Sequence, residues 1–149
     1  MLAVGSTAPD FALPDETGAV RTLGELLADG PLLLWFYPGD FTPICTREAC
    51  AFRDATPELA PGTGHSIGRV VGISAQDSAS HARFKQAYGL NFTLLADAER
   101  RTIRAYDATG PFGFGTARVT YRIGQDRRIL DAVGARFRIA PHLELLQRR

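Results

Sequence analysis

The sequence predicts an α/β fold in which a central mixed β-sheet is flanked by helices. The run 31–37 is apolar throughout, too short to span a membrane and without alternation, and 69–74 is a second apolar run. Both are expected to be strands buried on both faces of a sheet. Helix signals follow each run, which is the order typical of parallel strands covered by helices. Strands expected at 117–123 and 128–133 are joined by a short turn, and this antiparallel hairpin makes the sheet mixed.

The N-terminal segment is expected to form a short hairpin before the first buried strand. An extended segment at 8–14 leads into turn residues at 15–18, with Phe11 and Leu13 packing inward. One helical turn is expected at 23–28, directly before the apolar run.

A breaker cluster and a helix start follow the first strand. Residues 38–40 turn the chain out of the sheet. Thr42 then suits the N-cap position and Pro43 the first helical position. A helix is therefore expected from Pro43 to about Thr56, where Pro57 ends or kinks it.

The rest of the chain continues the alternation of strands and helices. In chain order, we expect a loop at 58–68, a helix from 77 or 78 to 88, a strand at 92–95, a helix at 97–105, a glycine-rich loop at 107–116 and a terminal helix at 139–147. Gly89 suits the end of the helix expected from 77 or 78 to 88. The glycine-rich loop carries Phe112 and Phe114, which bring aromatic surface toward the carboxyl ends of the strands.

Cys45 falls in the first turn of the helix that follows the first buried strand. Open α/β folds place their chemistry beyond the carboxyl ends of strands. Unpaired N–H groups and the dipole at a helix N-terminus favour the thiolate, which is the reactive form of cysteine. The alternative is that Cys45 is one more small buried apolar residue. The hydroxyl of Thr42 and the second cysteine, Cys50, favour the reactive interpretation.

The spacing of Cys45 and Cys50 bears on whether they form a disulfide. Residues five apart on an intact helix are roughly 8–9 Å apart at Cα, whereas a disulfide requires about 4.4–6.8 Å. If both are helical, part of the helix must unwind before they bond. This spacing suits a bond formed during turnover better than a permanent structural disulfide.

Two motifs in this stretch resemble a known family. Pro38, Thr42 and Cys45 match the P-x-x-x-T-x-x-C signature of peroxiredoxins. The segment from Asp40 to Cys50 resembles the PrxQ subgroup, also called bacterioferritin comigratory protein. The resemblance implies a thioredoxin-like fold over a single domain of residues 1–149. It also implies that Cys45 is the peroxidatic cysteine and Cys50, five residues later, the resolving cysteine.

The same resemblance gives Arg118 a role. Arg118 opens the segment Arg-Val-Thr-Tyr, which matches the family's R-x-T-[FY] pattern. The resemblance implies that its guanidinium reaches the active site, where it would stabilise the Cys45 thiolate and polarise a peroxide oxygen. Without the resemblance, an ordinary surface arginine would be the preferred interpretation.

Three further residues are candidates for the site. Thr42 is expected to cap the helix, and its hydroxyl can also donate toward the Cys45 sulfur and accept from the peroxide. Pro38 is a turn former that, in the functional interpretation, shields the thiolate from water. Glu48 lies one turn after Cys45, where its negative charge would disfavour the thiolate unless a cation such as Arg118 neutralises it.

The predicted function is that of a thiol peroxidase that reduces hydrogen peroxide and organic hydroperoxides. Cys45 becomes a sulfenic acid, Cys50 resolves it as a disulfide, and thioredoxin or a similar dithiol recycles the enzyme. Two alternatives stay open. One is a protein thiol–disulfide oxidoreductase, although such enzymes normally carry Cys-x-x-Cys. The other is a non-enzymatic peroxide sensor whose helix unfolds on oxidation.

Composition limits the other classes of function. With a net charge of +1, a nucleic-acid-binding protein is disfavoured. No segment suits a membrane span or signal peptide, and two cysteines fit a reducing cytoplasm. His65, His81 and His142 are dispersed, so they are interpreted as surface or packing residues and no metal or other cofactor is expected. A monomer is expected, with a homodimer as the alternative.

Overall fold

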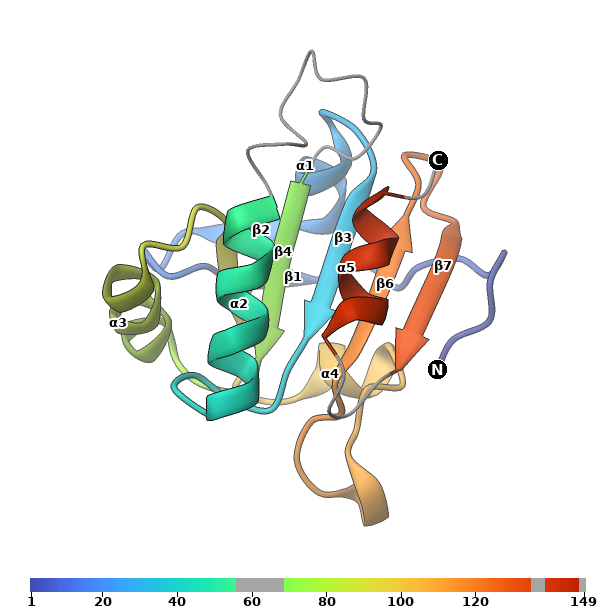
Figure 1. The fold of residues 1–149 in the computed structure, drawn as a ribbon. Coiled ribbons are helices and arrows are strands. Elements are labelled where there is room, and N and C mark those ends of the chain that lie inside the picture. Colours follow the sequence, from blue (N-terminus) through green and yellow to red (C-terminus); the bar gives the residue numbers. More distant parts are fainter. Residues whose placement is uncertain (56–68, 135–138, 148–149) are drawn as a thin grey trace.

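The computed structural model describes residues 1–55, 69–134 and 139–147. Its main sheet has five strands in the order β5-β4-β3-β6-β7. These strands are β3 (Leu32–Phe36), β4 (Arg69–Ser74), β5 (Thr93–Ala96), β6 (Val119–Ile123) and β7 (Ile129–Gly134). β4 pairs in parallel with β3 and with β5, whereas β6 is antiparallel to β3 and to β7. The predicted mixed sheet is therefore confirmed (Figure 1).

A two-stranded antiparallel sheet precedes it, formed by β1 (Ala12–Pro14) and β2 (Val20–Thr22). Phe11, just before β1, is buried in the core, and Leu13 packs against the same cluster. The expected N-terminal hairpin is thus present. It is followed by α1 (Leu23–Leu27), which Thr22 caps by accepting a hydrogen bond from the backbone N–H of Glu25.

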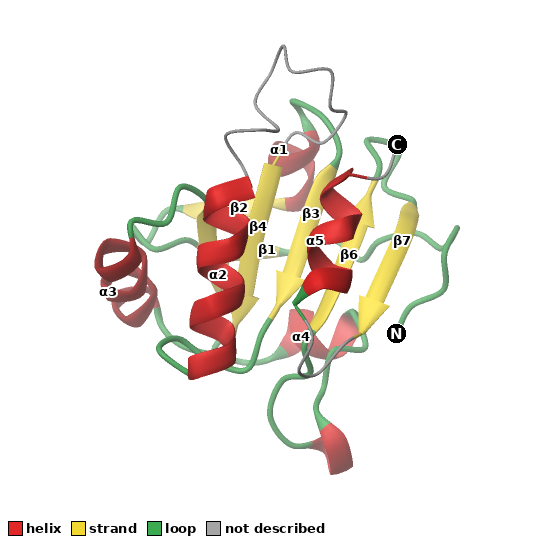
Figure 2. Ribbon diagram, in the orientation of Figure 1, coloured by secondary structure: helices red, strands yellow, loops and turns green. Residues whose placement is uncertain are grey.

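Helices cover both faces of the main sheet. α2 (Pro43–Ala55) and α5 (Ala140–Gln147) lie side by side over one face, and α1 and α4 (Arg101–Ala105) cover the other (Figures 1 and 2). α3 (Ser78–Tyr88) packs beside β5. It begins after the N-cap Asp77 and ends at Gly89, which has left-handed backbone angles, as the sequence predicts.

The central strand β3 is buried on both faces, because its side chains alternate between two apolar clusters. One cluster contains Leu33, Trp35 and Tyr37 from β3 and its end, and lies under α2 and α5. The other contains Leu32, Leu34 and Phe36, and lies under α1 and α4. The continuous apolar run is the sequence signature of this double burial.

Helix α4 begins four residues later than the sequence predicts. The sequence places a helix start at Asp97, whereas the structure has a turn over 97–100 and begins the helix at Arg101. Arg100 has left-handed backbone angles, with φ of 62°, which interrupts helical geometry there. Asp97 still stabilises the first turn of the helix, because its carboxylate accepts a hydrogen bond of 2.7 Å from the backbone N–H of Ile103.

The predicted loop at 107–116 contains one short 3-10 turn, Pro111–Gly113. The predicted end of the active-site helix near Pro57 and the loop at 58–68, which includes His65, lie outside the described residues. Within the described part of the chain, every helix is too short or too polar to cross a membrane.

Candidate active site

Cys45 lies at the start of α2, just beyond the carboxyl end of β3. The backbone N–H of Thr46 donates to the carbonyl of Thr42 at 2.8 Å, so helical hydrogen bonding begins ahead of the cysteine. Its side chain is fully buried in the cluster between α2 and the sheet. The predicted placement of a thiol in the first turn of a helix is confirmed.

Arg118 reaches Cys45 from the neighbouring strand. Its Nη1 atom lies 3.3 Å from the sulfur of Cys45. The antiparallel register pairs Val119 with Phe36, which brings the residue just before β6 to the end of β3, where α2 begins. Arg118 is 8% exposed, so its charge acts in surroundings largely free of water, where electrostatic interactions are stronger. This geometry suits stabilisation of a thiolate.

Glu48 shares the same guanidinium nitrogen. Its Oε1 atom accepts a hydrogen bond of 3.2 Å from Nη1 of Arg118 and a short one from the indole nitrogen of Trp35. The carboxylate is fully buried. Burial raises the pKa of Glu48 to about 7, even though Arg118 and Trp35 favour the charged form. Glu48 is therefore poised to change its charge near neutral pH.

A histidine on the C-terminal helix completes this cluster. His142 is fully buried, with Nε2 3.7 Å from Oε2 of Glu48 and Nδ1 2.6 Å from the hydroxyl oxygen of Thr120. The sequence interpretation of His142 as a surface or packing residue did not anticipate this contact. The signal available was its spacing of three from Leu145, which is also buried and places both on one face of α5.

Thr42 and Pro38 are both exposed. The hydroxyl of Thr42 donates to the carbonyl of Gly39 at 2.8 Å, and thus stabilises the turn that precedes α2. The structure therefore directs this hydroxyl toward the loop. Pro38 lines a cavity that Arg118 also lines.

Cys50 lies on the same helix as Cys45, is partly exposed and carries a free thiol, as does Cys45. An intact helix keeps residues at this spacing about 8–9 Å apart at Cα. A bond between them therefore requires local unwinding of α2.

A second buried cluster anchors the loop before α2. Asp40 accepts hydrogen bonds from the hydroxyls of Tyr37 at 2.6 Å and Ser80 at 2.8 Å, and its Oδ2 lies 2.7 Å from Nδ1 of His81. Burial alone would raise the pKa of Asp40, but its contacts with His81, Tyr37 and Ser80 outweigh that effect and lower it. His81, also interpreted from sequence as a surface or packing residue, is fully buried.

The cavity beside Arg118 has a volume of about 500 Å³. Most of its lining comes from the glycine-rich loop and β6; the side chains that shape it include Pro38, Pro111, Phe114, Arg118 and Val119. Of the two aromatic residues of this loop, Phe114 lines the cavity and is 81% exposed, whereas Phe112 does not line it and is 97% exposed. The open volume next to Arg118 could admit a small molecule that has a polar group at one end and an apolar substituent at the other.

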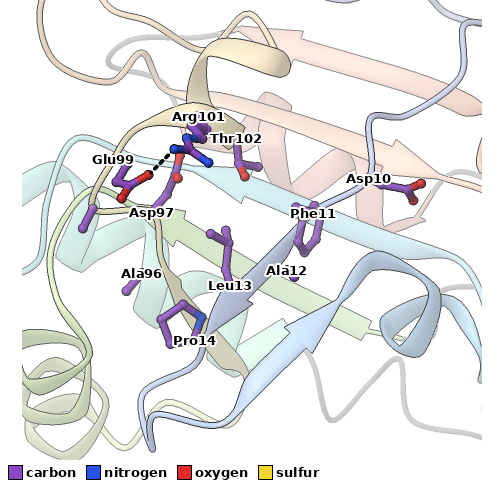
Figure 3. Close-up of a pocket in the computed structure, with 11 residues that line it drawn as sticks. Asp10, Phe11, Ala12, Leu13, Pro14, Ala96, Asp97, Glu99, Arg101 and Thr102 are labelled. Atoms are coloured by element: carbon purple, nitrogen blue, oxygen red, sulfur yellow. Dashed lines mark ion pairs between the residues drawn. The ribbon is translucent and has the colours of Figure 1, made fainter.

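A second cavity, of about 450 Å³, lies between the N-terminal hairpin and the start of α4 (Figure 3). Phe11, Asp97 and Thr102 are among its lining residues. Because Phe11 belongs to the core cluster on the α1 and α4 side, the sheet separates this cavity from Cys45. We therefore assign the chemistry to the cavity beside Arg118. Among the described residues, no group of histidine, cysteine or acidic side chains is arranged to hold a metal ion.

Comparison with known proteins agrees with this geometry. Residues 4–132 match the AhpC/TSA family. A Mycobacterium tuberculosis protein with a peroxiredoxin name is 36% identical over 146 residues, which cover 96% of this chain and 92% of that protein. The solved structure of peroxidoxin BcpB from Mycobacterium tuberculosis has a TM-score of 0.88 and 35% identity, over 99% of this chain and 95% of that one.

A solved Xanthomonas campestris structure is similar over 99% of this chain and 94% of its own, with a TM-score of 0.82 and 25% identity. It is the bacterioferritin comigratory protein of that organism, studied for its alkyl peroxide reduction activity. These similarities confirm the predicted thioredoxin-like fold. The chain therefore belongs to the AhpC/TSA family, as a peroxiredoxin and thus a thiol-dependent peroxidase, and it is similar to peroxiredoxin Q and bacterioferritin comigratory proteins.

Proposed function

We propose that Cys45 is the peroxidatic cysteine and that Arg118 is the cation that activates it. The observation that supports this proposal is the 3.3 Å contact between Nη1 of Arg118 and the buried sulfur of Cys45, at the N-terminus of α2. Both the guanidinium and the helix dipole favour a thiolate at that position. The same cation lines the cavity of about 500 Å³, where a hydroperoxide would approach.

The first step breaks the O–O bond of the substrate. The thiolate sulfur attacks the terminal oxygen of the hydroperoxide, and Cys45 becomes a sulfenic acid. The other oxygen leaves with the bonding electron pair and takes up a proton, which gives water or an alcohol. Arg118 and backbone N–H groups would stabilise the charge that develops on the oxygens. Thr42 would turn its hydroxyl from Gly39 toward the peroxide, and Pro38 would limit the access of water.

The second step forms the disulfide. The Cys50 thiolate attacks the sulfur of the Cys45 sulfenic acid, and hydroxide leaves and is protonated to water. Helix geometry requires α2 to unwind between the two cysteines before this attack. An external dithiol of the thioredoxin type would then reduce the Cys45–Cys50 disulfide by exchange.

Organic hydroperoxides are proposed as substrates together with hydrogen peroxide. Pro111, Phe114 and Val119 give the cavity an apolar lining beside Arg118. Apolar surface next to a cation suits an alkyl or aryl hydroperoxide, whose head group is polar and whose tail is not. The Xanthomonas campestris protein described for alkyl peroxide reduction supports the same substrate class. Glu48 is proposed as the partner that orients Arg118.

We further propose that residues 1–149 act as a single domain, as a monomer in the cytoplasm. The described elements build one five-stranded sheet with its two covering layers. A homodimer is the alternative, and sedimentation of the reduced protein would distinguish the two.

The function is tested by adding one equivalent of peroxide to the reduced protein and following intact mass with thiol trapping. Wild type should lose two hydrogens and show Cys45 bonded to Cys50. Cys50→Ser should consume one equivalent and stop, and Cys45→Ser should consume none. Sustained turnover with thioredoxin would separate the peroxidase from the sensor, which would be oxidised once. Oxidation of Cys45→Ser at the wild-type rate would refute the assignment.

A further inference from the structure

We propose that His142 is a positioning residue that shares a proton with Glu48, and thereby sets how much of the positive charge of Arg118 is available to the Cys45 thiolate. The proposal rests on the proposed role of Cys45. It gives the C-terminal helix a part in the reactivity of the Cys45 sulfur.

A single nitrogen atom of Arg118 contacts both Cys45 and Glu48. Nη1 of Arg118 lies 3.3 Å from the sulfur of Cys45 and 3.2 Å from Oε1 of Glu48. The carboxylate and the thiolate therefore compete for the same donor. When Glu48 is charged, Arg118 already has an anion at contact distance, and a second anion at Cys45 is disfavoured. When Glu48 is neutral, the cation is left to the thiolate.

The second carboxylate oxygen of Glu48 connects the competition for Arg118 to helix α5. Among the described residues, Oε2 of Glu48 is buried without a hydrogen-bond partner. A buried polar atom in this state is costly and favours any arrangement that gives it a proton or a donor. Nε2 of His142 lies 3.7 Å from this oxygen. A small closing movement of α5 would make this contact a hydrogen bond.

The other nitrogen of the imidazole ring also has a partner. Nδ1 of His142 lies 2.6 Å from the hydroxyl oxygen of Thr120, which can accept a hydrogen bond from the ring. In the tautomer in which Nδ1 donates to Thr120, Nε2 faces Oε2 of Glu48 and can share one proton with it. That proton gives either a neutral acid beside a neutral ring or a carboxylate beside an imidazolium. Both forms have zero net charge, and loss of the proton gives a net charge of −1.

Several other ionisable groups lie on the elements around this pair. They are Tyr37 at the end of β3; Cys45, Arg47, Cys50, Arg53 and Asp54 on α2; Arg118 just before β6 and Arg122 within it; Asp131 on β7; and Glu144 on α5. Arg122 lies opposite Asp131 in the β6–β7 register, and Glu144 is exposed. Arg118 contacts Glu48 directly and Cys45 shares the same nitrogen, so these are the groups through which the pair acts on the sulfur.

The consequence is a coupled proton balance at the site. With the shared proton present, Arg118 and the Cys45 thiolate neutralise each other. With it absent, Arg118 is neutralised by Glu48, and Cys45 holds its own proton. Removing His142 takes away one of the two places that can hold the shared proton, so the proton is bound less tightly. The Cys45 thiolate should then form only at higher pH.

The test compares His142→Gln with its parent in a Cys50→Ser background, which leaves Cys45 as the only thiol. The ultraviolet absorbance of the thiolate is recorded against pH, together with the rate of reaction with hydrogen peroxide. We expect the thiolate titration to move up by about one pH unit, which is about a tenfold loss of thiolate below the midpoint. The peroxide rate should follow the same displacement.

A double-mutant cycle distinguishes this role from a general structural effect. Glu48→Gln fixes a neutral side chain at that position, so the thiolate should form at lower pH, and His142→Gln should then produce no further displacement. Glu144→Gln removes a carboxylate from the exposed side of the same helix and is the matched control. Thr120→Val, which leaves the histidine in place but removes the partner of Nδ1, should displace the titration upward by a smaller amount.

Two results would overturn the proposal. One is a His142→Gln titration that superimposes on its parent, and the other is a displacement that persists at full size with Glu48→Gln. If His142→Gln fails to fold, the thiolate titration of Thr120→Val is judged by the same two criteria. The thiolate absorbance reports on Cys45 whether or not peroxide reacts, so failure of the proposed function would be seen separately, as a titrating thiolate that peroxide does not oxidise.

Discussion

Asp40 and Glu48 are both buried carboxylates close to the start of α2, yet their surroundings drive their pKa values in opposite directions. Asp40 receives hydrogen bonds from two hydroxyls and contacts His81, and these contacts lower its pKa in spite of burial. Glu48 has both of its donors on one oxygen, and burial raises its pKa to about 7. The number and placement of donors, rather than depth alone, decides the charge of each group.

The basic groups beside the two carboxylates differ in the same way. His81 has Nδ1 facing Asp40 and Nε2 3.0 Å from the carbonyl oxygen of Leu95. Nδ1 of His81 also lies 3.4 Å from the hydroxyl oxygen of Tyr37, so the ring contacts several members of the Asp40 cluster. Arg118 divides its donor between Glu48 and Cys45. We infer that the Asp40 cluster fixes the loop before α2, whereas the Glu48 cluster responds to the state of the sulfur.

The largest expected effect is on stability at the Asp40 cluster. Asp40→Asn should lower the free energy of unfolding by about 3–5 kcal/mol, because it replaces the buried carboxylate that accepts from two hydroxyls and contacts His81 with a neutral amide. Denaturant unfolding near neutral pH measures the change. Asp54→Asn, an exposed aspartate paired with Arg53, is the control and should change stability by less than about 0.5 kcal/mol. Equal losses in the two variants would remove the distinction between the clusters.

Glu48→Gln should alter the pH dependence of stability. The folded pKa of about 7 lies above the ordinary value of 4.5. The stability that the neutral acid contributes is therefore present below pH 4.5 and lost as pH rises through 7. The unfolding free energy of wild type minus that of Glu48→Gln should fall by about 3 kcal/mol between pH 4 and pH 8. A difference that is constant over this range would mean that Glu48 is charged throughout, like Asp40.

Arg118 substitutions measure what the shared cation contributes to the reaction. Arg118→Ala should slow oxidation of Cys45 by about a hundredfold, the usual effect of removing one stabilising donor. Arg118→Lys should slow it about tenfold, because an ammonium keeps the charge but cannot present two donors in one plane. Rates are measured in single turnover with hydrogen peroxide. Arg101→Ala, at an exposed arginine paired with Glu99, is the control, and a comparable loss there would contradict the role of Arg118.

The position of Cys45 could be predicted from the sequence, because the signals that determine it lie close together in the chain. An apolar run, a breaker cluster and a helix start occur within one short stretch and place Cys45 at the end of β3. The position of Arg118 came from the family resemblance alone. The β3–β6 register supplies the physical reason, since it brings the start of β6 beside the end of β3.

The histidines could not be placed, because their partners are distant in sequence. His142 meets Thr120 and Glu48 only when α5 packs against β6 and α2. His81 meets Asp40 across 41 positions of the chain. Periodicity shows that a helix has an inward face, but it does not show which strand or helix that face meets. The late start of α4 has a similar origin, because the left-handed backbone at Arg100 has no signal in the residue type.

The substitution with the smallest expected effect tests whether Asp40 depends on each of its hydrogen-bond donors. Ser80→Ala removes one hydroxyl, 2.8 Å from Oδ2, while His81 still contacts the same oxygen. Because that oxygen keeps its contact with His81, the loss should be about 1 kcal/mol, which is the usual net value of one hydrogen bond. Denaturant unfolding resolves a change of this size. Ser78→Ala, on the same helix, is the control. A loss as large as that of Asp40→Asn would mean that the cluster fails as a unit, whereas no loss would mean that His81 alone holds the carboxylate.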